Sequence, residues 1–91
     1  MSVTVRIPTQ LRTLTGGAGE TTAEGSTVGE VLRALDAAHS GLADRLFDEA
    51  GALRRFVNVF LDDEDVRFLD GLDTPVGAGQ TLSIVPAVAG G

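Results

Sequence analysis

The sequence predicts a single α+β domain in which a mixed sheet of about five strands packs on one main helix. Three observations lead to this prediction. The chain opens with alternating polar and apolar residues, continues with a helical pattern that carries a capping signal, and ends in further runs rich in β-branched and aromatic residues. With 91 residues, 43% of them hydrophobic, there is room for one modest core.

The first part of the chain is typical of a two-stranded hairpin. Apolar and polar side chains alternate over residues 3–7, and Pro8 marks the end of this first strand. The glycine-rich run 15–19 is a turn, and the polar, β-branched run 20–24 follows it. We therefore expect residues 20–24 to return as an antiparallel strand.

A capping box predicts the start of the main helix. Thr27 and Glu30 form the Thr-x-x-Glu pattern in which each side chain bonds a backbone N–H near the helix start. The helix is expected to run to about His39, and residues 42–47 are expected to add one short helical turn. Its apolar face has the spacing i, i+3, i+4, i+7 and consists of Val28, Val31, Leu32 and Leu35.

The second half of the chain predicts another hairpin and a final strand. The run 56–61 is rich in β-branched and aromatic residues, and after the acidic turn 62–65 we expect residues 66–68 to return as a strand. Residues 81–85 form the last strand, which Pro86 ends.

The order hairpin, helix, hairpin and final strand is that of a β-grasp domain. We expect this domain to span residues 1–85 and a flexible Gly-Gly tail to occupy residues 86–91. The net charge of −6 disfavours binding to nucleic acid or to an anionic membrane surface. The chain begins without a signal-peptide pattern and contains no apolar run of membrane-spanning length, so a cytoplasmic location is expected.

The sequence offers little to an enzyme mechanism. It contains no cysteine, and its one histidine, His39, lies near the end of the predicted helix, where a surface role is expected. The acidic run 62–65 lacks the ligand spacing of a calcium loop, so we predict no metal site. This run is either a solvated turn or an acidic patch for a basic partner.

The C-terminal tail is the strongest functional signal. It follows the last strand directly and carries no bulky side chain after Val88. At about 3.3 to 3.6 Å per extended residue it would reach roughly 20 Å, enough to enter the active site of a partner. Two terminal glycines leave the last carbonyl open to attack, so Gly91 is the candidate reactive residue. The residues expected to insert with it are Pro86, Ala87, Val88, Ala89 and Gly90.

A predicted β-grasp domain that ends in Gly-Gly resembles the ubiquitin-like sulfur carriers of the ThiS/MoaD type. Segments 56–59, 63–68 and 86–91 are similar in particular to the actinobacterial carriers of cysteine biosynthesis, and the similarity covers essentially the whole chain. One departure is Asp62-Asp63, at the hairpin turn where many members have Asn or Asn-Gly. It concerns the turn type and leaves the tail unaffected.

The resemblance implies a protein co-substrate that binds no cofactor. A ubiquitin-activating-type adenylyltransferase would use ATP to adenylate Gly91, and a sulfur donor would then displace AMP to leave a thiocarboxylate. The sulfur would pass to a cysteine synthase-like acceptor enzyme that depends on pyridoxal phosphate (PLP), and a zinc metalloprotease would release the cysteine. PLP and zinc would belong to these partners.

The partner-docking surface is expected on the sheet face opposite the helix. Because Leu82 and Ile84 face the core, alternation places Ser83 and Val85 on the exposed face. Phe60 is a further candidate for this surface, although the core is an alternative place for it. Three other functions stay open: the small subunit of molybdopterin synthase, a ubiquitin-like protein modifier, and a binding module whose tail has no role.

Overall fold

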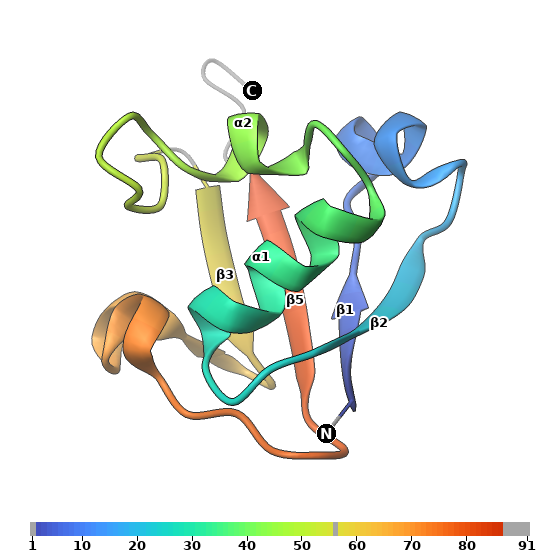
Figure 1. The fold of residues 1–91 in the computed structure, drawn as a ribbon. Coiled ribbons are helices and arrows are strands. Elements are labelled where there is room, and N and C mark those ends of the chain that lie inside the picture. The colour runs from blue at the N-terminus through green and yellow to red at the C-terminus, as the bar shows by residue number, and fades with distance from the viewer. Residues whose placement is uncertain (1, 56, 87–91) are drawn as a thin grey trace.

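A mixed five-stranded sheet forms one layer of the domain, and a single long helix crosses one of its faces (Figure 1). The computed structural model describes residues 2–55 and 57–86. The strand order is β2-β1-β5-β3-β4, with β1 and β5 parallel and the other neighbouring pairs antiparallel. The strands are β1 (Ser2–Arg6), β2 (Glu20–Glu24), β3 (Val57–Leu61), β4 (Glu64–Asp65) and β5 (Thr81–Pro86). The helices are α1 (Val28–Ala38), α2 (Leu42–Leu46) and the 3-10 helices η1 (Thr9–Thr15), η2 (Val66–Phe68) and η3 (Gly71–Asp73).

This arrangement confirms the β-grasp prediction, and α1 is built as its sequence indicated. The Thr27 hydroxyl accepts a hydrogen bond from the Glu30 backbone N–H at 3.3 Å. The Glu30 carboxylate in turn accepts a hydrogen bond from the Ser26 N–H at 3.0 Å. Ser26 is one residue before Thr27, whose N–H is the usual donor in a capping box. These two bonds satisfy N–H groups that have no acceptor within the helix. Helix α1 ends at Ala38, and His39 caps its C-terminus. His39 is half-buried, so part of its side chain lies at the surface, as predicted.

The core lies between the sheet and α1. Along each strand, residues that face the core alternate with residues that face outward. The apolar face of α1 packs on the residues that face the core. Leu42 and Leu46 from α2 close one end of this layer and are fully buried. Helix α1 and strands β1, β3 and β5 contribute Val28, Val31, Leu32, Leu35, Val3, Val5, Val57, Val59, Leu61, Leu82 and Ile84.

The prediction of a returning strand at residues 66–68 was wrong. The strand that returns after β3 is only Glu64–Asp65, inside the run expected to be the turn, and Val66–Phe68 form a 3-10 helix. The turn is shorter than expected because Asp62 adopts a left-handed conformation, with φ of 55°. Asp65 then accepts a hydrogen bond from the Arg67 N–H at 2.9 Å, which caps a helix and ends the strand.

Two smaller features also differ from the sequence reading. No element was expected between Pro8 and the turn at 15–19, where η1 packs Leu11 into the core. The last strand extends one residue further than expected, because Pro86 pairs with Val57 across an antiparallel register. Strand β2 has the predicted bounds.

Candidate functional site: the outer sheet face and the root of the C-terminal tail

The tail leaves the domain from the central strand of the sheet. Strand β5 lies between β1 and β3, and its last described residue, Pro86, is paired with Val57. A strand with neighbours on both sides gives the tail a rigid starting point. The predicted insertion residues 87–91 lie outside the described residues, so their role stays a prediction.

The three predicted docking residues lie together on the face of the sheet opposite α1. Phe60 is directly opposite Ser83, and Val85 is opposite Asn58 on the neighbouring pair. Phe60 and Val85 are therefore diagonal neighbours, roughly 7–8 Å apart in such a ladder. Val85 is 45% exposed, and Phe60 and Ser83 are half-buried. The core does not take up Phe60, because the alternation of β3 gives that place to Val59 and Leu61.

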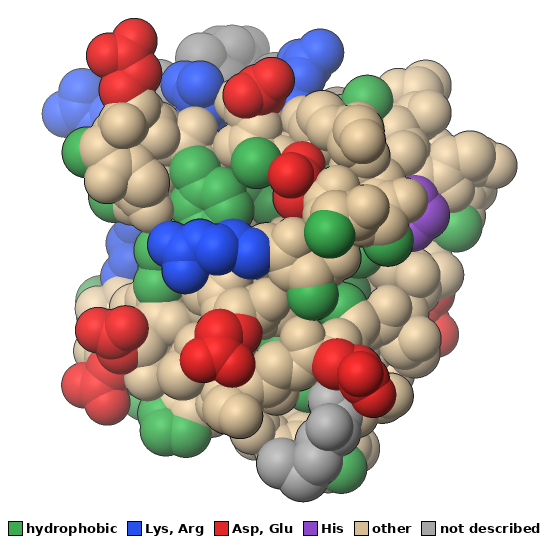
Figure 2. All heavy atoms as spheres, viewed as in Figure 1, with side chains coloured by type: hydrophobic (Ala, Val, Ile, Leu, Met, Phe, Trp, Pro, Cys, Tyr) green, Lys and Arg blue, Asp and Glu red, His purple; other side chains and the backbone are tan. Residues whose placement is uncertain are grey.

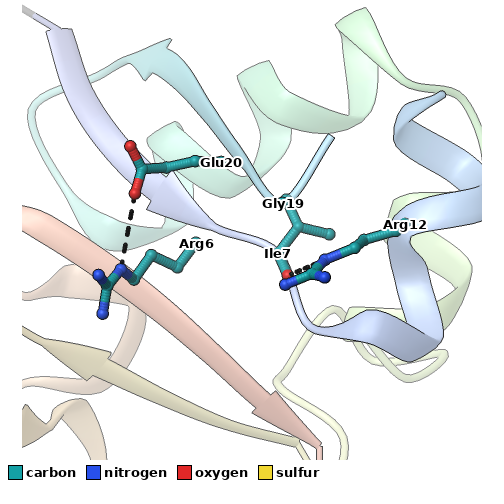
Figure 3. A pocket seen from close by; sticks show the side chains of 5 residues that line it. All are labelled: Arg6, Ile7, Arg12, Gly19 and Glu20. Atoms are coloured by element: carbon teal, nitrogen blue, oxygen red, sulfur yellow. Dashed lines mark hydrogen bonds and ion pairs between the residues drawn. The ribbon is translucent and has the colours of Figure 1, made fainter. Parts of the chain in front are cut away.

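Charged residues flank this small apolar centre. The register places Arg6 beside Ser83 and Asp65 beside Phe60 on the same face. The Arg6 Nε lies 3.6 Å from a Glu20 carboxylate oxygen, and both side chains are more than half exposed (Figure 3). An ion pair this exposed contributes little to stability, so both charges are available to a partner. The face therefore combines an apolar centre with a charged border, as docking surfaces commonly do.

A surface pocket next to this border has a structural role. In Figure 3 the Arg12 side chain reaches back toward β1, where its Nε donates to the Ile7 carbonyl at 3.1 Å. The guanidinium also lies 3.1 Å from the place where a side chain on Gly19 would begin. These contacts join β1, η1 and the start of β2, and a side chain at position 19 would have to displace the Arg12 guanidinium slightly.

Sequence reasoning missed Arg67 and Asn58. The Arg67 guanidinium donates to the Asn58 Oδ1 and to the Arg54 carbonyl, both at 2.7 Å. Arg54 itself donates to the Asp44 carbonyl at 2.9 Å. Because Asn58 is opposite Val85, this chain of hydrogen bonds supports the outer face of the sheet beside the root of the tail. No local pattern reveals it, since the partners are 9, 10 and 13 residues apart in the sequence.

The acidic turn is partly structural. The Asp62 carboxylate accepts hydrogen bonds from the Thr81 N–H at 3.1 Å and from the Gln80 side chain at 3.3 Å. Asp62 therefore connects the turn to the start of β5, while its neighbours Asp63 and Glu64 are exposed. Within residues 2–55 and 57–86, no cluster of three or more potential metal ligands occurs. In the same residues, no helix has the length and apolarity needed to cross a membrane.

Known proteins resemble this chain in sequence and in architecture. The sulfur carrier protein CysO of Mycobacterium tuberculosis (strain ATCC 25618 / H37Rv) is 50% identical over 93 residues, a match that covers 100% of both chains. A chain in the crystal structure of the Amycolatopsis orientalis BexX/CysO complex is 52% identical with a TM-score of 0.92, over 98% of this chain and 99% of that one. Small archaeal modifier protein 3 of Haloferax volcanii is 44% identical over 66 residues, covering 72% of this chain and 71% of its own. The model of the ThiS family matches residues 5–91, and the chain therefore belongs to the ThiS family.

Proposed function

We propose that this chain is a sulfur carrier protein whose C-terminal carboxylate at Gly91 is converted to a thiocarboxylate for cysteine biosynthesis. The single observation that carries the proposal is the identity of 50% to the sulfur carrier CysO over the full length of both chains. The fold supports it, because a rigid central strand leads directly into the Gly-Gly tail.

The reaction follows from the chemistry of a carboxylate. An ionised carboxylate is a poor acyl donor, because its negative charge repels nucleophiles. In the proposed first step a Gly91 carboxylate oxygen attacks the α-phosphorus of ATP, and pyrophosphate leaves. In the second step a sulfur nucleophile attacks the acyl carbon and AMP leaves, which yields the thiocarboxylate once the donor has released its sulfur. Both steps take place in an adenylyltransferase of the ubiquitin-activating type, so the carrier is a co-substrate.

The thiocarboxylate would then serve as the nucleophile of a second partner. We propose that a PLP-dependent, cysteine synthase-like enzyme takes up the tail and forms the bond between sulfur and carbon there. The acyl group of the resulting thioester would move from sulfur to the amine of the new cysteine, which forms a peptide bond and frees the thiol. A zinc metalloprotease would then hydrolyse this peptide bond, release cysteine and restore the Gly91 carboxylate. The dependence of the first step on ATP favours the cytoplasm as the compartment. PLP and zinc are held by the partners in this scheme.

The experiment that tests the proposal is intact-protein mass spectrometry. The full chain is incubated with an adenylyltransferase of this type, ATP and sulfide. We expect the mass to increase by the difference between sulfur and oxygen, and we expect fragmentation to locate the change at Gly91. An unchanged mass with several such enzymes would contradict the proposal.

The outer sheet face is expected to dock the adenylyltransferase. Replacing Val85 with Glu would place a charge in the apolar centre, next to Phe60, and leave it unpaired in the complex. Because buried central residues dominate interface energies, we expect kcat/KM for adenylation to fall about 30-fold or more. Pyrophosphate release measures the rate.

The matched control for this variant is Ala37→Glu. It adds the same charge at an exposed position on α1, which covers the opposite face of the sheet. We expect it to retain most of the activity. Equal losses in the two variants would show that overall charge, and not the Val85 surface, governs docking.

A protein modifier is the second candidate function. It is favoured by the identity of 44% to small archaeal modifier protein 3 over about three quarters of this chain. A modifier would be joined through Gly91 to lysine side chains of target proteins. Ladders of conjugates on a denaturing gel, absent for a chain without Gly91, would support this function over sulfur carriage.

A further inference from the structure

The most exposed large apolar side chain among the described residues is Phe68, in η2. It is 87% exposed, and its neighbour Leu69 is 40% exposed. Isolated apolar residues are common on protein surfaces, but two adjacent ones next to a hollow are less so. Leu69 lines a surface pocket together with Leu61 and with the acidic turn that joins β3 to β4. We name Phe68 and Leu69 the η2 patch.

The η2 patch is held rigidly although it is exposed. Val66 anchors the segment in the core with no exposed surface, and Leu69 N–H donates to the Val66 carbonyl at 2.9 Å. The side chain of Arg67 is bound to Asn58 and to the Arg54 carbonyl. Beyond the patch, the buried Thr74 hydroxyl accepts from the Asp70 N–H at 3.0 Å. A backbone held in this way loses little conformational freedom on binding, which favours association.

Carboxylates lie beside the η2 patch, and Asp62, Asp63 and Glu64 line the same pocket as Leu69. Five acidic residues lie within positions 62–70, and the one basic residue of that stretch, Arg67, is engaged in the hydrogen bonds described above. Figure 2 shows acidic side chains over the part of the surface formed by η2 and η3, at the lower left of the view. The five are Asp62, Asp63, Glu64, Asp65 and Asp70.

The η2 patch lies at the opposite end of the sheet from the root of the tail. Strand β3 begins at Val57, which is paired with Pro86, and ends at Leu61, which is paired with Leu82 and precedes the acidic turn. The four residue steps between them span about 13 Å along the strand. In Figure 1 the segment after β4 lies at the lower left, whereas β5 ends at the top. The η2 patch and the root of the tail are therefore separated along β3, although Arg67 of η2 also bonds Asn58 beside Val85.

We propose that the η2 patch is a second docking surface, for a partner protein that receives Phe68 in an apolar pocket bordered by Lys and Arg. Charge complementarity identifies this occupant, because the acidic border favours a basic surface. A second copy of the chain does not fit, because a two-fold contact through Phe68 would bring the same acidic borders together. The inference does not depend on the chemistry of the tail.

The test begins with a photo-crosslinking residue, p-benzoylphenylalanine, in place of Phe68 in the full chain, expressed in cells of the source organism. The same residue in place of Thr13, which is exposed on η1, is the control. We expect one protein to be crosslinked from position 68 only, and mass spectrometry identifies it. Equal crosslinking from both positions, or crosslinking only to a second copy of the chain, would overturn the proposal.

Binding by the purified, identified protein completes the test. We expect Phe68→Ala to weaken binding about 30-fold, as for a central aromatic contact, and Thr13→Ala, at the control position on η1, to leave it unchanged. Replacing Asp63 with Asn and Glu64 with Gln should weaken binding and reduce its salt dependence, because these two carboxylates are exposed. Phe68→Ala should keep the thermal midpoint of the parent. A dissociation constant that is insensitive to Phe68→Ala or to salt would refute the η2 patch as a docking surface.

Discussion

A chain that ends at Gly90 is expected to form thiocarboxylate at least about 100-fold more slowly than the full chain. Strand β5 determines where the tail begins, so the length of the tail determines how far the carboxylate reaches. Each extended residue adds about 3.3 to 3.6 Å, and reacting atoms must approach to about 3 to 3.5 Å. Loss of one residue therefore withdraws the carboxylate by about the whole reactive distance.

Lengthening the tail provides the matched control for reach. A chain extended by one glycine after Gly91 keeps the Gly-Gly sequence but moves the carboxylate outward, and we expect it to be equally poor as a substrate. Intact-mass time courses with the adenylyltransferase, ATP and sulfide give the rates. Both variants should unfold at the same temperature as the parent. If either variant reacted at more than half the parent rate, tail length would not be what positions the carboxylate.

Replacing Leu32 with Ala is expected to lower the free energy of unfolding by about 2 to 5 kcal/mol. Leu32 lies on the buried face of α1 with no exposed surface, among the side chains of the sheet. The change removes buried apolar surface and leaves a cavity that the surrounding strands cannot fill. A domain of this size has a total stability of about 5 to 15 kcal/mol, so the loss is a large fraction of it. Thermal unfolding should shift downward by roughly 10 °C or more.

The same substitution at Leu69 is the control for the loss of buried surface. Leu69 is 40% exposed, so Leu69→Ala removes the same atoms from a site that is partly in contact with water. We expect a loss below about 1 kcal/mol, measured by urea denaturation with an unchanged m-value. Equal losses of unfolding free energy at Leu32 and Leu69 would show that Leu32 is not part of the buried core.

The sequence predicted the elements whose signals are local. The capping box at Thr27 and Glu30 located the start of α1 correctly, because the bonds that begin a helix join residues three or four apart. Strand β2 and the outward direction of Ser83 and Val85 also followed from local alternation. These signals need no knowledge of the remainder of the chain.

The prediction of a strand at residues 66–68 was wrong because the same residues can form either a strand or a 3-10 helix. Val66, Arg67 and Phe68 have the composition of a strand, but Asp65 bonds the Arg67 N–H and begins a 3-10 helix. The segment is then stabilised by the bonds of Arg67 to Asn58 and Arg54. Strand propensity is weak compared with such tertiary contacts.

By itself the sequence determined the fold class, the face on which Ser83 and Val85 lie, and the Gly-Gly tail that carries the proposed chemistry. Only the tertiary structure decided that Asp62 connects the turn to β5, that Arg67 bonds Asn58 and the Arg54 carbonyl, and that Phe68 is left exposed. The physical reason is range: capping and alternation act between residues close in sequence, whereas these three outcomes depend on contacts between segments distant in the sequence.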